Sequence, residues 1–274
     1  MTSWLCRACG TQYPPAESPP ATCPVCDDPR QYVPHDTGQQ WLEWSELLAT
    51  HRADVRLDHG ILGIGCTPEF AIGQRALLVT HDEGNVLWDC TPFLDDEIVA
   101  TIRELGGLRA IAVSHPHYYA AMVEWAHAFD CPVYLHEAER EWVQRPDQAI
   151  RFWNGETHSL ADGLTLIRCG GHFSGAQVLH CAAGRSRERG ALLAGDVVQV
   201  IPDRRHVSFM WSYPNLVPLG PGQITAIVAA LAPFAFESIH GAWFGRVVTS
   251  DGSAVVRRSA ERYLRAITGA GLPA

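Results

Sequence analysis

No stretch of the sequence approaches the roughly 20 consecutive apolar residues that a membrane-spanning helix needs, so we expect no membrane partner. The first ten residues, MTSWLCRACG, also lack the basic region and the roughly 7–15-residue apolar stretch of a signal peptide. We therefore expect a cytoplasmic protein. Cysteines in that reducing compartment bind metals or pack in the core rather than forming disulfides.

Positive charge is also scarce: the sequence has 21 Lys and Arg but 30 Asp and Glu, which gives a net charge of −9. This balance argues against nucleic acid as a partner. Neither an internal repeat nor a low-complexity tract is present, and 47% apolar with 19% charged residues is ordinary for a globular enzyme. A chain of 274 residues can form one large domain with a small appendage.

The composition changes near residue 35. Residues 1–34 are rich in Cys and Pro and have too few apolar residues for a core of their own, so we assign them to a four-cysteine zinc-binding module. Residues 35–274 form the second predicted domain, and it opens with a short amphipathic connecting helix over residues 39–48. Beyond residue 52, strands and helices are interspersed, and this pattern indicates a layered α/β arrangement.

In the second domain we expect two blocks of strands, with helices interspersed and at the end. The strands are expected over residues 59–66, 75–90 (two strands joined by the DEGN turn), 108–114, 131–136, 164–169, 176–182 and 190–196. The helices are expected over residues 95–105 (capped by Thr91 or Asp95), 122–129, 137–145, 224–234 and 253–269.

Four of the nine cysteines form two Cys-x-x-Cys pairs, Cys6 with Cys9 and Cys23 with Cys26, separated by thirteen residues. Two such turns can close a tetrahedron of thiolates around Zn²⁺, which then supplies the folding free energy that a small core cannot. A redox dithiol needs only one pair, and a rubredoxin-like iron site generally has a longer spacing. We therefore predict structural zinc, with no chemistry at a filled ligand shell.

Polar residues that bind metals follow several apolar strands. His115 and His117 come directly after the strand over residues 108–114, and His172 follows the glycines after residues 164–169. Asp196 ends the strand over residues 190–196, and His240 lies in a similar Ile-His-Gly context. Ligands at the ends of adjacent strands are what a shared open metal site requires.

This order resembles the metallo-β-lactamase superfamily, which includes glyoxalase II-like thioesterases. The resemblance covers most of residues 52–250 and implies an αβ/βα sandwich of two mixed sheets flanked by helices. It further implies a three-histidine site of His115, His117 and His172, with Asp196 as the bridging carboxylate and His240 as the last ligand of a second site. Asp89 resembles the family aspartate that supports the metal loop.

The sequence departs from the family pattern after the first two histidines. Tyr119 and Ala120 stand where the family has Asp and His, so the second site keeps only Asp196 and His240. We therefore expect one active-site metal, Zn²⁺ with iron as the alternative. Asp196 is the expected proton acceptor, His240 assists, and Tyr119 either stabilises an oxyanion or only fills the second site.

The predicted function is hydrolysis of a small ester, thioester or lactone by a mononuclear metal site. The alternatives are an iron oxidoreductase resembling persulfide dioxygenases, with His115, His172 and Asp196 as ligands, and a non-catalytic or accessory protein. A nuclease and a β-lactamase are disfavoured by the acidic charge, the missing second metal and the missing signal peptide. Residues 202–215 either cover the pocket and bind an anionic substrate group or only pack on the surface, and a homodimer stays open.

Overall fold

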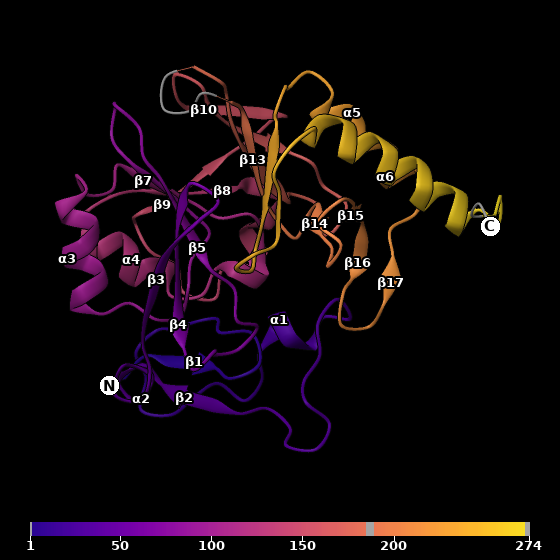
Figure 1. Cartoon of the computed structure of the whole chain (residues 1–274). Helices are drawn as coiled ribbons and strands as arrows, with labels where there is room; N and C mark the ends of the chain where they lie inside the picture. The colour runs from indigo at the N-terminus through magenta and orange to yellow at the C-terminus, as the bar shows by residue number, and fades with distance from the viewer. Residues whose placement is uncertain (1, 185–188, 272–274) are drawn as a thin grey trace.

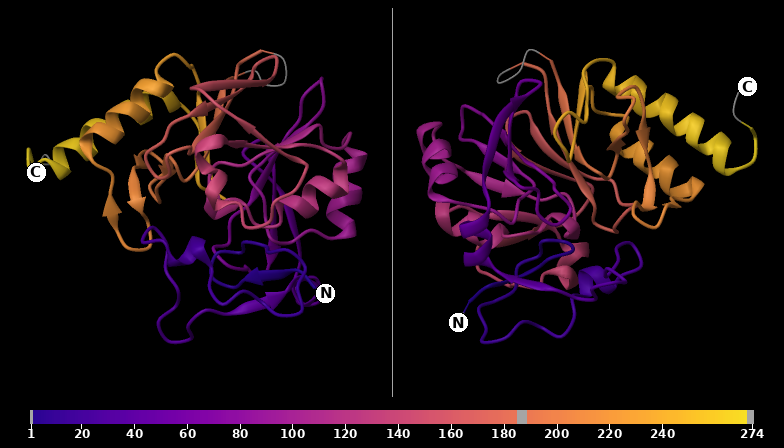
Figure 2. Two further views of the ribbon diagram at one scale, coloured as in Figure 1. Left: turned by 180° about the vertical axis from the view of Figure 1, so that it is seen from behind. Right: turned by 60° about the horizontal axis from the view of Figure 1, so that its bottom comes forward.

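The computed structural model describes residues 2–184 and 189–271. Two large sheets face each other, with helices on their outer sides (Figures 1 and 2). The first sheet has the strand order β3-β4-β5-β6-β7-β8-β9, antiparallel as far as β6 and parallel from β6 to β9. Its strands are β3 (Arg52–Asp58), β4 (Ile61–Thr67), β5 (Ala76–Val79), β6 (Val86–Trp88), β7 (Ala110–Ala112), β8 (Val133–His136) and β9 (Ile150–Trp153).

The second sheet has the order β10-β11-β12-β13-β18-β19, in which only β13 and β18 are parallel. Its strands are β10 (Thr157–Ala161), β11 (Leu164–Arg168), β12 (Gln177–Cys181), β13 (Ala191–Gly195), β18 (Ser238–Gly241) and β19 (Val247–Val248). Successive side chains of β13 pack on opposite faces of the sheet: Leu193 packs between the two sheets, and Leu192 packs under the outer helices. Burial on both faces explains why these strands are continuous apolar runs.

Four principal helices complete the layers: α3 (Asp96–Glu104) and α4 (Met122–Phe129) on the first sheet, and α5 (Pro221–Leu231) and α6 (Gly252–Ile267) on the second. The α3 helix begins where the sequence predicts, since Asp95 Oδ1 accepts the Ile98 N–H at 2.8 Å. The αβ/βα sandwich expected from the resemblance is thus confirmed. Within the described residues, no helix is both long enough and apolar enough to cross a bilayer.

The N-terminal segment lies across one end of the sandwich, at the bottom of Figure 1. Its elements are β1 (Trp4–Cys6), α1 (Pro24–Asp27), β2 (Trp41–Glu43) and α2 (Trp44–Thr50). The helix predicted over residues 39–48 was partly wrong, because residues 41–43 pair with β1 and only then does the helix begin. The segment also has a small cluster of its own, in which Tyr13 and Val25 pack with the four cysteines.

Short elements join the main strands: the 3₁₀ turns η1 (Pro116–Tyr118) and η2 (Glu137–Trp142), and the strands β14 (Gln199–Val200), β15 (Val207–Ser208), β16 (Met210–Ser212) and β17 (Val217–Pro218). The helix expected over residues 137–145 is therefore a shorter 3₁₀ helix. Its Glu139 turns inward to accept the Gly175 N–H, and Val143 already has an extended backbone.

Candidate metal centres

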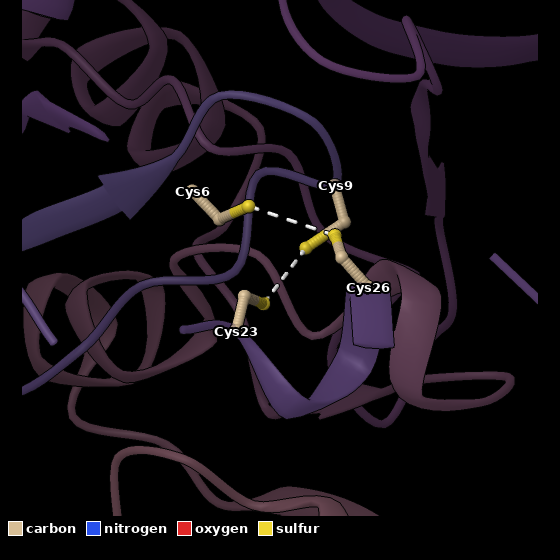
Figure 3. Close-up of side chains that lie close together, drawn as sticks. All are labelled: Cys6, Cys9, Cys23 and Cys26. Carbon is tan, nitrogen blue, oxygen red and sulfur yellow. Dashed lines mark hydrogen bonds between the residues drawn. The ribbon is translucent and has the colours of Figure 1, made fainter. Parts of the chain in front are cut away.

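The four N-terminal cysteines point toward one another (Figure 3) and are all buried. Cys6 Sγ lies 3.6 Å from Cys26 Sγ, and Cys9 Sγ lies 3.7 Å from Cys23 Sγ. Tetrahedral zinc with Zn–S bonds of about 2.3 Å requires S···S separations of about 3.8 Å. The spacing therefore fits an ion of this size held by four thiolates.

A second group of ligand atoms is formed by His115, His117 and His172, whose nitrogens lie within 4.8 Å of one another. His172 Nε2 is 3.2 Å from His117 Nδ1, and His115 Nε2 is 3.2 Å from Asp196 Oδ1. Zn–N bonds of about 2.0–2.1 Å in a tetrahedron place nitrogens about 3.3–3.4 Å apart. We call these three histidines the histidine centre, with Asp196 beside it.

The loop that carries the first two histidines is held from the end of β6. Asp89 Oδ1 accepts the Ser114 N–H at 2.7 Å, and this is the support expected of Asp89. His115 then has an extended backbone, and Pro116 begins the η1 turn that brings His117 back toward the same point. Proline suits this first position, because its fixed φ matches a helical turn and its missing N–H is not needed there.

Two contacts orient the rings of His115 and His172, so that Nε2 of each faces the centre. His115 Nδ1 lies 3.0 Å from Ser114 Oγ, and His172 Nδ1 donates to the Met210 carbonyl at 3.2 Å. Because a carbonyl can only accept, His172 Nδ1 carries the proton and Nε2 keeps its lone pair, and the Ser114 hydroxyl can accept from His115 Nδ1 in the same way. Metal-binding histidines are commonly oriented by a hydrogen bond from the other ring nitrogen.

A glycine permits the close approach of the two sheets at this point. Gly195 ends β13 with φ at +54°, and a Cβ there would lie 2.8 Å from Ser114 Oγ and 3.2 Å from Tyr118 Cε2. Because only glycine avoids that clash and readily accepts this φ, β13 can deliver Asp196 beside His115.

Burial sets the charges of the site. It lowers the pKa of His115 and His117 and, together with the Arg30 guanidinium, lowers the pKa of His172 to about 4. The imidazoles are therefore neutral, as metal ligands must be. Burial also raises the pKa of Asp196 to about 7. Among the described residues, His115 Nε2 and Asp196 Oδ1 are buried without a hydrogen-bond partner, which suits a bound cation.

The other predicted site residues, His240 and Tyr119, are not among the three ligands of the histidine centre. His240 lies on β18 in register with Leu193, and its Nε2 is 3.2 Å from Ser238 Oγ. It is not part of the group of three histidines found among residues 2–184 and 189–271. Tyr119 is buried, and burial together with the charge of Glu139 raises its pKa. Tyr118, rather than Tyr119, is the tyrosine beside Asp196, whose charge adds to burial in raising the pKa of Tyr118.

Two residues of the segment 202–215, Met210 and Tyr213, contact the histidine centre. The Met210 carbonyl accepts from His172, the Tyr213 ring lies 5.7 Å from the His172 ring, and the Tyr213 hydroxyl donates to the Asp196 carbonyl at 2.6 Å. These contacts favour a packing role for the aromatic residues of the segment.

Three residues of the site were missed from the sequence: Tyr118, Phe173 and Arg30. Phe173 follows His172 directly, and its ring lies 4.9 Å from that of His117. Arg30 follows Cys26 by four residues, and its guanidinium lies 3.7 Å from the centroid of the Phe173 ring. Adjacency to a ligand could have singled out Phe173, but no sequence signal places Arg30 beside a histidine 142 residues away.

Comparison with known proteins agrees with this architecture. No protein-family model matches the chain. Solved structures with the same fold include the metallo-β-lactamase FIM-1 from Pseudomonas aeruginosa in its mono-zinc form, with a TM-score of 0.55 and 16% identity over 76% of this chain and 95% of that one. TTHA1623 in a di-iron-bound form has a TM-score of 0.51 and 21% identity over 72% of this chain and 97% of that one.

One relative is similar along almost the whole chain. The uncharacterized protein YmaE of Bacillus subtilis is 44% identical over 270 residues, which cover 97% of each chain. The relative therefore spans the four-cysteine segment as well as the sandwich. The chain belongs to the family of YmaE and has the metallo-β-lactamase fold.

Proposed function

We propose that the protein is a metal-dependent hydrolase with one metal ion at His115, His117 and His172, acting on a small ester, thioester or lactone. The observation that carries this proposal is the convergence of three neutral, buried imidazoles within 4.8 Å, with Asp196 beside them. Three protein nitrogens leave a fourth position for water, which is the arrangement of catalytic rather than structural zinc.

A bound zinc ion would supply a water with a pKa lowered to about 7, and hence hydroxide near neutrality. Asp196, whose Oδ1 lies 3.2 Å from His115 Nε2, is placed to orient that water and accept its proton. We assign His240 an assisting role from β18, and Tyr119 the role of filling the space of the missing second metal site. The four cysteines hold a second, structural zinc that takes no part in the chemistry.

The residues present support one metal rather than two. Ala120 offers no ligand atom, and the hydroxyl of Tyr119 is a neutral phenol whose pKa is raised by burial. A second dication would thus have only Asp196 and His240, fewer donors than such ions require. A single metal ion is compatible with this fold, since FIM-1 is described in a mono-zinc form.

An iron oxidoreductase is the second candidate. The observation that favours it is the 3.2 Å contact between His115 and Asp196, because these two residues and His172 would form the two-histidine, one-carboxylate set of a facial iron site. Iron content and oxygen uptake distinguish this candidate from the hydrolase.

The test combines metal content with hydrolysis of a panel of esters, thioesters and lactones. We expect two zinc ions per chain in the wild type, one in His115→Ala, and loss of hydrolysis in that variant. His127→Ala is the control, because His127 is an exposed histidine paired with Asp147, away from the centre. A zinc content that His115→Ala does not change would refute the proposal, and one iron with oxygen uptake would favour the second candidate.

A further inference from the structure

Arg30 belongs to the cysteine-rich N-terminal segment, yet its side chain lies against the histidine centre. Nη1 donates to the backbone carbonyl of His172 at 3.2 Å, and Cζ lies 3.7 Å from the centroid of the Phe173 ring. That ring in turn lies 5.4, 4.9 and 5.1 Å from the rings of His115, His117 and His172. A guanidinium over an aromatic face at this distance is attractive, so Arg30 holds Phe173 against all three ligands.

Asp28 fixes the orientation of this guanidinium. Arg30 Nε and Nη2 donate to the two carboxylate oxygens of Asp28 at 2.6 and 2.8 Å, and each side chain is only 14% exposed. Such a two-bond fork needs the planar guanidinium, and a lysine cannot reproduce it. The Arg30 side chain is therefore placed by Asp28.

Asp28 in turn is placed by one of the two cysteine turns. The N–H groups of Cys26 and Asp27 both donate to the Cys23 carbonyl at 2.9 Å, and the Asp28 N–H donates to the Pro24 carbonyl at 3.2 Å. The short α1 helix formed by these bonds contains Cys26, and Cys23 precedes it as the N-cap residue. Whatever holds the thiols together also holds Asp28.

Strand β16 connects the same two regions from the other side. Ser212 Oγ donates to the Arg30 carbonyl at 2.9 Å, while the Met210 carbonyl accepts from His172 Nδ1 at 3.2 Å. His172 is thus oriented at its ring by β16 and at its carbonyl by Arg30. Both contacts depend on the position of residues 28–30.

We propose that Arg30 is a positioning residue of the histidine centre and that it couples metal binding at the four cysteines to metal binding at the three histidines. The inference rests on the proposed function, because it takes the histidine centre to be a metal site. A small cysteine module owes its fold to its metal. Zinc loss would therefore release the Cys23–Cys26 turn, then Asp28 and Arg30, and finally the His172 loop.

The test measures the affinity of the histidine centre for Co²⁺ in the full chain, with one zinc retained at the cysteines. Chelator competition gives the dissociation constant, and the visible absorption of the bound ion reports its ligand geometry. We expect Arg30→Gln to weaken Co²⁺ binding about tenfold and to change the absorption, as loss of a residue that orients a ligand commonly does. Arg30→Lys should recover little of this loss.

The proposed coupling between the cysteine site and the histidine centre makes a second prediction. Cys26→Ser should weaken Co²⁺ binding at the histidines to a similar extent, and the double variant with Arg30→Gln should be no weaker than Cys26→Ser alone. Arg7→Gln is the matched control, since Arg7 is an exposed arginine of the same segment that donates to the Trp41 carbonyl. It should leave the affinity unchanged.

An Arg30→Gln protein with wild-type affinity and absorption would overturn the proposal, and so would additive losses in the double variant. The Arg30 variants decide the question even where Cys26→Ser does not fold. A wild-type protein whose Co²⁺ absorption equals that of His115→Ala would mean that the histidines bind no metal. That result would refute the proposed function as well. It can be distinguished from a histidine centre that binds Co²⁺ with an affinity independent of Arg30, which would refute only the role of Arg30.

Discussion

The two groups of metal ligands are built in opposite ways. The four cysteines come from residues 6–26, and two hairpin-like turns suffice to bring their thiols within bonding distance of one ion. The three histidines come from the ends of β7 and β11, on different sheets, and meet only when the whole sandwich has formed. A local, closed set of four thiolates suits a structural ion, whereas a long-range set of three imidazoles beside a carboxylate leaves room for water. Stability should therefore depend more on the first group, and chemistry on the second.

The largest expected effect on stability comes from breaking the cysteine group. Cys9→Ser should remove one zinc per chain and lower the free energy of unfolding by about 4 kcal/mol or more, because structural zinc contributes folding free energy directly. Thermal unfolding and elemental analysis measure both effects. Cys66→Ser is the control, since Cys66 is half-buried on β4 and far in sequence from the two pairs. Equal effects of the two substitutions would remove the distinction between the groups.

The η2 helix contains a buried carboxyl, that of Glu139, which should make stability depend on pH. Burial raises the pKa of Glu139 to about 7 from 4.5. Because the folded-state pKa is raised, the native protein holds this proton between pH 4.5 and 7 while the unfolded chain releases it. Stability should therefore fall as pH rises through this window, by about 3 kcal/mol for this group.

Glu139→Gln should remove that part of the pH dependence, measured as the difference between the variant and wild-type denaturation curves from pH 4.5 to 7.5. The amide oxygen of the substituted side chain is expected to remain an acceptor for the Gly175 N–H that Glu139 now accepts. The exposed neighbour Glu137, changed to Gln, should leave the pH dependence as it is. A flat wild-type profile that Glu139→Gln does not alter would contradict the prediction.

Gly195→Ala should damage the histidine group and spare the cysteine group. The new Cβ would meet Ser114 Oγ at 2.8 Å, in addition to the strain of a left-handed backbone, so we expect a loss of about 2 kcal/mol in urea unfolding. Gly60→Ala separates the two causes, because Gly60 has φ at +84° but nothing within 4 Å of the added Cβ. The Gly195 variant should also lose metal at the histidines while the Gly60 variant keeps it. Equal losses of stability would show that the close approach to Ser114 is unimportant.

The sequence predicted the parts of the molecule that depend on local pattern. Apolar strands followed by His115, His172 or Asp196 could be recognised because each ligand ends its own strand, and the Cys-x-x-Cys pairs were equally local. The contact of Arg30 with His172 could not be predicted, since it depends on how the N-terminal segment packs across the end of the sandwich. Residues 41–43 were mistaken for helix because their pairing with β1 adds backbone hydrogen bonds that amphipathic spacing does not reveal.

The smallest expected effect distinguishes two neighbouring tyrosines. Alignment with the family pattern singled out Tyr119, but the η1 turn places Tyr118 beside Asp196 and leaves Tyr119 near Glu139. Once a substrate has been identified, Tyr118→Phe should lower kcat about tenfold, because the Asp196 carboxylate loses a neighbouring hydroxyl. Tyr119→Phe should change kcat less than about threefold, since the charge that acts on its hydroxyl is that of Glu139 rather than that of Asp196. The reverse ranking, at unchanged metal content, would identify Tyr119 as the oxyanion donor. It would also mean that the histidine centre rearranges when substrate binds.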